Sequence, residues 1–330
     1  RPDTVAAALL DRITESTVTG PDGVPGWLTL YLMPDGQHTR LGMTSDSWYD
    51  GRTGIAAVQR QAVELGVRRR DATDGAVTDA LVTLLANDSY ARFRRLRTIG
   101  LGFSGVGGLI RALLTAPASA VTRADWDRLL SGFPTGLIDR DRVFDLMGGV
   151  AGLIPPLARL VERGHDAARP LLAAAADHLA AQQNDSGAWP TMMAERPLTG
   201  LAHGASGGSL ALFEAGVALG RAELVDAAAR ALRYEDDLFD PDAGNWPDLR
   251  TGSRHQQSGD RFMVAWCHGA PGIGLARIRA LQLAPAHPDA DRWRRDLDAA
   301  MHTTAHAPDS GTDHLCCGVS GRAAVLRIAG

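Results

Sequence analysis

The chain has 330 residues, of which 45% are hydrophobic, so it is long enough to bury a large core. Its 34 basic and 38 acidic residues give a formal net charge of -4, a balance that excludes the strongly basic surface of a nucleic-acid-binding protein. No run of about 18 apolar residues occurs, and the N-terminus does not resemble a secretory signal. The composition therefore predicts a soluble, cytoplasmic protein with no membrane span.

The first predicted element is a short strand or hairpin around residues 27–32. There the sequence Trp-Leu-Thr-Leu-Tyr-Leu alternates weakly between polar and apolar side chains. No long linker or low-complexity segment divides the chain after this point. We therefore predict that residues 1–330 form a single domain.

A Gly-x-x-Gly pair followed by an apolar stretch recurs six times along the chain. The first glycines of successive pairs are 44 to 65 residues apart, which leaves room for two helices in each repeat. The pairs are Gly51/Gly54, Gly105/Gly108, Gly149/Gly152, Gly204/Gly207, Gly269/Gly272 and Gly318/Gly321.

The segments after the glycine pairs differ from those between them. Residues 108–114, 152–158 and 272–278 carry few charges and are predicted to be inner helices. Residues 170–180 and 222–232 have mixed faces that suit an outer layer. Alternating inner and outer helices predict an all-α fold, an α/α toroid that is a double-layered helical barrel. If each pair opens an inner helix, the helix N-termini gather at one end, where their N–H groups favour anions.

All three cysteines lie near the last two glycine pairs. Cys267 and Cys316 occupy equivalent positions, two residues before the first glycine of each pair, and Cys317 adjoins Cys316. Three such thiolates can converge on a tetrahedral zinc ion at about 2.3 Å and leave a fourth position open, which is typical of a catalytic site. The alternative is that the cysteines are only small buried hydrophobes. The repeat equivalence favours one zinc ion per chain.

Two further residues have positions that favour chemistry. His203 directly precedes a first glycine one repeat before Cys267, so it is predicted to face the same cavity and to transfer protons. Asp145 lies one repeat earlier and either orients this histidine or caps a helix. His268 and His314 flank the cysteines, and we expect them to support the ligands or to face solvent instead of binding the metal.

These residues lie in motifs that resemble those of lanthionine cyclases, most closely the C-terminal cyclase domain of class II lanthipeptide synthetases. The resemblance spans most of the chain. It is carried by Ser47-Trp-Tyr-Asp-Gly-Arg-Thr-Gly, Phe103-Ser-Gly-Val-Gly-Gly, Phe144-Asp-Leu-Met-Gly-Gly, Leu201-Ala-His-Gly, Trp266-Cys-His-Gly-Ala-Pro-Gly and Leu315-Cys-Cys-Gly-Val-Ser-Gly.

The resemblance implies a sevenfold α/α toroid that binds Zn²⁺ and acts on a dehydrated ribosomal precursor peptide. The implied reaction adds a cysteine thiol to dehydroalanine or dehydrobutyrine and closes a lanthionine or methyllanthionine ring. By motif, Cys267, Cys316 and Cys317 would be the zinc ligands. His203 would be the acid and base, assisted by Asp145.

The chain departs from the resemblance in three ways. Six glycine pairs are present where seven repeats are implied, and the chain ends at Gly330, so the seventh repeat is expected to be incomplete and the chain an excised or truncated part of a larger synthetase. The dehydratase domain implied as its partner is missing. Cys317 stands where relatives often have histidine, and we hypothesise that three thiolate ligands keep the substrate sulfur unusually nucleophilic.

Three other functions fit parts of the pattern. The first is a module that binds glutathione or a peptide thiol at zinc without forming rings. A carbohydrate-active α/α barrel would need paired acidic residues and many aromatic side chains, whereas aromatic residues make up only 5% of this chain. A purely structural zinc site is the third, and an open coordination position would argue against it.

Overall fold

The computed structural model describes residues 2–21, 23–33, 37–67, 75–80, 83, 99–251 and 261–330. The chain divides into two compact units, Arg1–Pro134 and Thr135–Gly330. The predicted single domain over residues 1–330 stays a prediction. No helix in the described part of the chain is long and apolar enough to cross a membrane.

Unit 1 begins with a helix and two small antiparallel sheets. The strand or hairpin predicted around residues 27–32 is present as the hairpin of β3 and β4, in which Leu30 pairs with Leu41. Arg60 of α2 donates to the carbonyl oxygen of Ala112 at 3.1 Å and so ties α2 to α5. The described elements are α1 (Pro2–Glu15), β1 (Val18–Thr19), β2 (Pro25–Gly26), β3 (Leu28–Leu32), β4 (Thr39–Met43), α2 (Arg52–Glu64), α5 (Val106–Leu114) and α6 (Arg123–Ser131).

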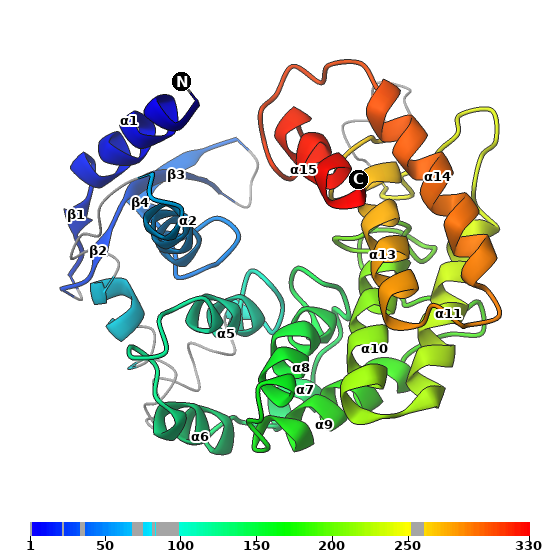
Figure 1. Cartoon of the computed structure of the whole chain (residues 1–330), viewed down its shortest axis with the longest axis horizontal. Helices are drawn as coiled ribbons and strands as arrows, with labels where there is room; N and C mark the ends of the chain where they lie inside the picture. The colour runs from blue at the N-terminus through cyan, green and yellow to red at the C-terminus, as the bar shows by residue number, and fades with distance from the viewer. Residues whose placement is uncertain are drawn as a thin grey trace. The chain divides into compact units, whose positions relative to one another are not determined.

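Unit 2 is helical and has two layers. Helices α8, α10, α13 and α15 pack against one another in this order, and α9, α11 and α14 each pack on the helix that precedes them (Figure 1). The elements are α7 (Gly136–Asp139), η1 (Val150–Gly152), α8 (Ile154–Glu162), α9 (Ala168–Ala181), α10 (Ala205–Leu219), α11 (Ala222–Asp236), α13 (Ala270–Leu283), α14 (Ala290–His306) and α15 (Val319–Ala329). The predicted inner and outer segments of this unit therefore form helices in separate layers.

The first glycine of every pair is the N-cap of a helix, as predicted. Only the third pair differs, because Gly149 opens the 3-10 turn η1 before α8 begins at Ile154. Pro155 and Pro156 follow immediately after Ile154. Because proline has no N–H group, neither residue can donate an α-helical hydrogen bond to the carbonyl groups of the preceding turn.

The second glycine lets the preceding loop fold back onto the helix start. A Cβ at Gly207 would collide with the carbonyl oxygen of Leu201, and one at Gly272 would collide with that of Trp266. Because backbone atoms cannot swing away as a flexible side chain can, these positions exclude any side chain. The loops before the inner helices therefore lie tightly against the first helical turn.

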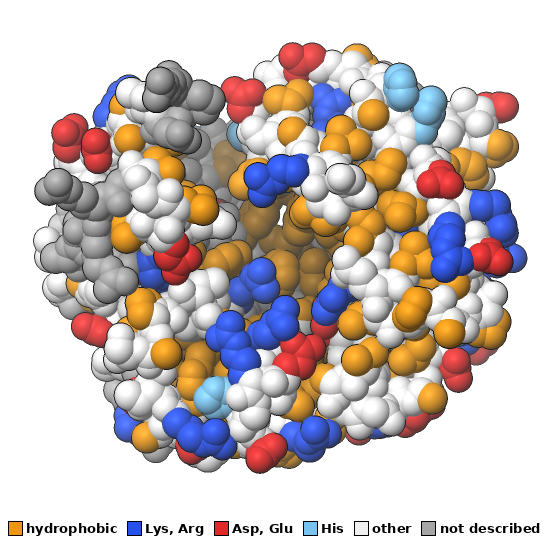
Figure 2. All heavy atoms as spheres, in the orientation of Figure 1, with side chains coloured by type: hydrophobic (Ala, Val, Ile, Leu, Met, Phe, Trp, Pro, Cys, Tyr) orange, Lys and Arg blue, Asp and Glu red, His pale blue; other side chains and the backbone are white. Residues whose placement is uncertain are grey.

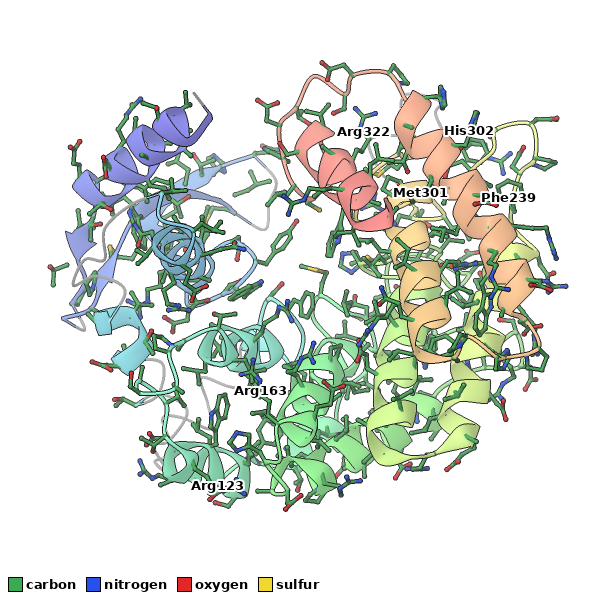
Figure 3. The ribbon with its side chains drawn as sticks, in the orientation of Figure 1. Arg123, Arg163, Phe239, Met301, His302 and Arg322 are labelled. Carbon is green, nitrogen blue, oxygen red and sulfur yellow. The ribbon has the colours of Figure 1, made fainter. Side chains whose placement is uncertain are left out.

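The core between α13 and α14 is packed around aromatic and sulfur-containing side chains. Trp246 and Ile273 are fully buried, and Phe239 and Met301 pack against them (Figure 3). A Cβ at Gly274 would collide with Met301, so this small residue lets α14 approach α13 closely. On the right-hand side of Figure 2, basic and acidic side chains are interspersed over α11 and α14.

A buried ion network joins inner and outer helices. Arg277 of α13 is fully buried and bonds Glu235 at 2.5 Å, Asp236 at 2.9 Å and Asp296 at 3.2 Å. One guanidinium thus meets three carboxylates. Burial, together with the neighbouring Asp296, raises the pKa of Asp236 to about 7.

We predict that Gly207→Ala destabilises the protein by about 1–3 kcal/mol, because its methyl group overlaps the Leu201 carbonyl. Denaturant unfolding of the variant and wild type measures the difference. Gly136→Ala is the control, since a Cβ there meets nothing within 4 Å. Equal stability of Gly207→Ala and wild type would show that the loop can move aside.

A second prediction concerns pH. The raised pKa means that native Asp236 prefers to be protonated, so its contribution to stability is present below its ordinary pKa of about 4 and is lost as pH rises through about 7. Asp236→Asn should therefore gain stability relative to wild type as pH rises from 5 to 8. Urea unfolding across this range measures it, with exposed Asp298→Asn as the control. Parallel pH curves for Asp236→Asn and wild type would contradict the prediction.

Candidate metal centre

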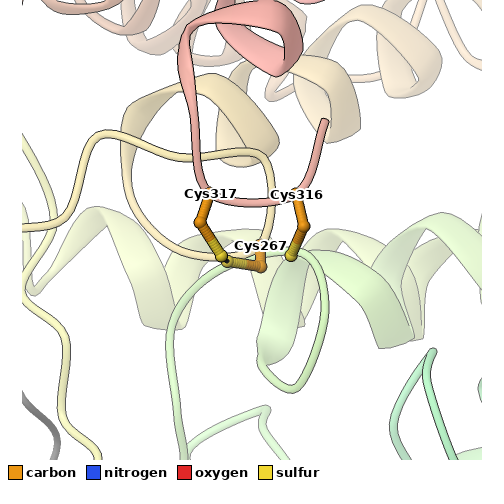
Figure 4. A group of neighbouring side chains, drawn as sticks. All are labelled: Cys267, Cys316 and Cys317. Carbon is orange, nitrogen blue, oxygen red and sulfur yellow. Dashed lines mark hydrogen bonds between the residues drawn. The ribbon is translucent and has the colours of Figure 1, made fainter. Parts of the chain in front are cut away.

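The three cysteines converge from two loops of unit 2. Cys267 lies in the loop before α13, and Cys316 and Cys317 lie in the loop before α15 (Figure 4). The three sulfur atoms lie within 4.8 Å of one another, and those of Cys267 and Cys317 are 3.8 Å apart. The equivalent positions that the sequence indicated are thus brought to one point.

This cluster has the chemistry and dimensions of a zinc site. Two sulfur ligands of a tetrahedral zinc ion, each bound at about 2.3 Å, are about 3.8 Å apart. The separation of the Cys267 and Cys317 sulfurs matches this value. Cys267 is buried and Cys317 is exposed, so the cluster has a closed side and an accessible side. The donor set therefore fits the predicted zinc ion, whose binding stays a prediction.

The electrostatics of the thiols also favour a bound cation. The hydrogen bond with Cys316, burial and the neighbouring thiols all raise the pKa of Cys267. Burial and Cys316 likewise raise the pKa of Cys317. Three thiolates at these distances repel one another, so their ionisation together requires a positive charge among them.

Arg250 contributes a cation beside the cluster. Its guanidinium binds both carboxylate oxygens of Asp248, at 3.0 and 2.8 Å, and lies 3.2 Å from the sulfur of Met263. The hydrogen bond with Asp248 raises the pKa of Arg250, and the Cys267 and Cys317 thiolates add to the rise. Sequence reasoning missed Arg250, because no motif or repeat position marks it.

His203 and Asp145 form a hydrogen-bonded pair, which is one of the two roles that the sequence left open for Asp145. Nδ1 of His203 lies 2.6 Å from Oδ2 of Asp145, and the other oxygen of Asp145 accepts from the backbone N–H groups of Gly148 and Gly149. Asp145 therefore both orients the histidine and anchors its own turn. Because a carboxylate only accepts, Nδ1 is the protonated nitrogen, which leaves Nε2 of His203 as a base.

The loop of His203 is bonded to the loops on either side. The backbone N–H groups of Leu201 and Ala202 both donate to the carbonyl oxygen of Cys267, at 3.1 and 3.0 Å. The carbonyl oxygen of Ala202 in turn accepts from the N–H of Leu146, at 3.2 Å. These bonds bring the segments of Asp145, His203 and Cys267 together at one end of the inner layer.

The two other histidines differ in their surroundings. His268 is only 1% exposed and stacks on His203 with ring centroids 5.8 Å apart, so of its two expected positions the solvent-facing one is excluded and the one that supports the ligands is left. Burial lowers the pKa of His268 to about 3, which keeps it neutral near physiological pH. His314 is exposed, in agreement with the expectation.

Sequence reasoning also missed two carboxylates that hold the loops. Asp141 accepts from the N–H groups of Phe144 and Val150, both at 3.0 Å, and so closes the loop that contains Asp145. Glu235 has a corresponding place beside the loop of His203. Asp141 lies four residues before Asp145 and could have been noticed there, whereas Glu235 lies on α11, far from every motif.

Comparison with known proteins identifies the fold and the family. The chain is similar to a solved structure of nisin cyclase, with 16% identity and a TM-score of 0.58, covering 84% of this chain and 74% of that one. It is also similar to a structure described as "UGL_D88N/dGlcA-Glc-Rha-Glc", with 14% identity and a TM-score of 0.51, covering 98% and 86%. The predicted all-α, α/α toroid fold class is thereby confirmed.

Sequence comparison assigns the family more directly. A search of curated proteins finds no match. The family model described as "Lanthionine synthetase C-like protein" matches residues 42–330, which include every cysteine, His203 and Asp145. The chain therefore belongs to the lanthionine synthetase C-like family.

Proposed function

We propose that this chain is a zinc-dependent peptide cyclase. It would add cysteine thiols of a dehydrated ribosomal precursor peptide to dehydroalanine or dehydrobutyrine and form lanthionine or methyllanthionine rings. The observation that carries the proposal is the convergence of three thiols at the starts of α13 and α15, with the His203–Asp145 pair on the adjoining loop. A dehydratase domain of the same synthetase, working in the cytoplasm, would supply the substrate.

Cys267, Cys316 and Cys317 would hold the zinc ion. When bound there, zinc supplies a Lewis acid that lowers the pKa of a substrate thiol, so that thiolate forms near neutral pH. The exposed side of the cluster, at Cys317, leaves access for that thiol. The buried side, at Cys267, is closed by the backbone bonds from the His203 loop.

His203 and Asp145 would manage the protons. Nε2 of His203 has no hydrogen-bond partner among the residues described by the structure, so it is able to take the thiol proton. The sulfur then forms a bond to the β-carbon of the dehydroamino acid. The electrons of the double bond between the α- and β-carbons move towards the carbonyl group. The proton passes from His203 to the α-carbon, which completes the addition without change in mass. Asp145 holds the imidazole in the required tautomer.

Two other functions are weaker fits. The same thiol cluster suits a module that only binds glutathione or a peptide thiol, but such a module has no use for an oriented histidine. A carbohydrate-active enzyme would need two carboxylates free to act on a sugar. The side chain of Asp145 is instead occupied by His203 and by backbone N–H groups.

Zinc content and thiol consumption test the proposal together. Wild type incubated with a purified dehydrated, cysteine-containing peptide should hold about one zinc ion per chain and should consume peptide thiols at unchanged peptide mass. Cys316→Ala should lose most of the zinc and all of the thiol consumption, because only two of the three proposed zinc ligands remain. Zinc without thiol consumption in wild type would favour the thiol-binding module.

The third thiolate gives a separate prediction. Cys317→His replaces a charged ligand with a neutral one, so a bound substrate sulfur should become less nucleophilic. We expect zinc to be retained, while the cyclisation rate falls or the pattern of rings changes. Mass spectrometry of peptide fragments after thiol alkylation measures both. If rate and ring pattern equal those of wild type, the three-thiolate set has no special role.

A further inference from the structure

A carboxylate of the outer layer reaches through to the loop of His203. Glu235 lies near the end of α11, and its side chain is fully buried. One of its oxygens accepts from the backbone N–H groups of Gly200 and Ser206, at 2.8 and 3.0 Å. The other accepts from the hydroxyl of Ser206 at 2.6 Å and from Arg277 at 2.5 Å. Both oxygens are therefore fully used.

The two backbone donors stand on either side of His203. Gly200 and Ser206 are each three residues away from it, so one carboxylate oxygen closes the loop 200–206 at both ends. Ser206 lies in the first turn of α10, whose N-cap Gly204 offers no side-chain acceptor. Glu235 thus satisfies a helix N-terminal N–H group from a neighbouring helix, where a negative charge is favoured.

The closed loop is also the one that touches the thiol loop. Gly200 has φ +97, and a Cβ there would lie 3.0 Å from the carbonyl oxygen of Cys267. The next two N–H groups, those of Leu201 and Ala202, bond that same oxygen. A shift of Gly200 would therefore move His203 relative to Cys267.

The loop of Asp145 is built in the same way. Asp141 accepts from backbone N–H groups on both sides of Asp145, as Glu235 does around His203. A buried carboxylate thus closes each of the two loops that carry the proposed proton-transfer pair. Arg277 holds Glu235 in place and is itself held by Asp236 and Asp296.

From this geometry we propose that Glu235 is a positioning residue, which holds the loop 200–206 so that His203 stays bonded to Asp145 beside the thiol cluster. The inference rests on the proposed role of His203 as acid and base. The hydrogen bonds and ion pair of Glu235 go to Gly200, Ser206 and Arg277, and none goes to the cysteines or to His203. It acts through the backbone of the loop and the hydroxyl group of Ser206.

Glu235→Gln is the principal test. Glutamine has the same shape, but its amide N–H₂ group can only donate. This group must face either the backbone N–H donors of the loop or Arg277, so the hydrogen bonds on that side are lost. We expect kcat for cyclisation to fall on the order of 10- to 100-fold, because a displacement of about 1 Å has effects of this size. KM for the dehydrated peptide and the zinc content should stay near the wild-type values.

A spectroscopic measurement reports the position of His203 without catalysis. Nδ1 of His203 and Oδ2 of Asp145 are 2.6 Å apart, so the proton between them should give a strongly deshielded NMR resonance. The resonance is assigned to this proton if it disappears in Asp145→Asn. We expect this resonance to weaken or shift in Glu235→Gln. If wild type forms no rings, the proposed function fails, but the resonance still tests the role of Glu235.

Two variants accompany the test. Glu235→Asp keeps the negative charge beside Arg277, which protects folding, but its shorter side chain no longer reaches the loop. It should change kcat and the resonance in the same direction as Glu235→Gln does. Glu214→Gln is the matched control, because Glu214 of α10 also pairs with an arginine of α13, Arg279 at 2.6 Å. It should leave both readouts unchanged. The proposal would be overturned if both Glu235 variants kept the wild-type kcat and the wild-type resonance. It would also be overturned if zinc content fell and KM rose by factors as large as the fall in kcat.

Discussion

The carbonyl oxygen of Cys267 is the point on which the arrangement of unit 2 depends. It accepts two N–H groups from the loop of His203, and that loop accepts in turn from the loop of Asp145. These bonds need the loops to lie against the helix starts, which is allowed only because the second residue of the pair, as at Gly207 and Gly272, has no side chain. The proposed metal ligands and the proposed proton-transfer pair are thus joined through backbone hydrogen bonds, which do not depend on side-chain rotamers.

The charged side chains of unit 2 also differ between the helix starts and the interior. Near the helix starts, the carboxylates of Asp145 and Glu235 accept from backbone N–H donors. Deeper in the unit, Arg277 meets three carboxyl groups, while burial and the neighbouring Asp296 raise the pKa of Asp236 against the opposing effect of Arg277. Buried ion pairs of this kind contribute little net stability, because the cost of desolvation offsets the attraction. Their value here is to define where α11, α13 and α14 stand relative to the loops.

Much of the candidate site could be predicted because it repeats. Cys267 and Cys316 share a position relative to a glycine pair, and His203 adjoins one, so a periodic pattern was enough to select them. The same register placed Asp145 one repeat before His203 but left open whether it orients the histidine or caps a helix. The burial of His268 did not follow, since its exposure is decided by how His203 and Gly200 cover it. Arg250 and Glu235 lie outside every motif, and sequence spacing contains no information about them.

The sequence by itself determined the helical class, extended structure around residues 27–32, the helix starts at the glycine pairs and the identity of the thiol ligands proposed for zinc. These depend on local backbone geometry and on periodicity, which are properties of neighbouring residues. Only the tertiary structure decided that the sulfurs of Cys267 and Cys317 lie 3.8 Å apart, that Asp145 reaches His203, and that Glu235 closes the loop from another layer. Those contacts join residues 29 to 58 positions apart, and such distances are set by how whole helices pack.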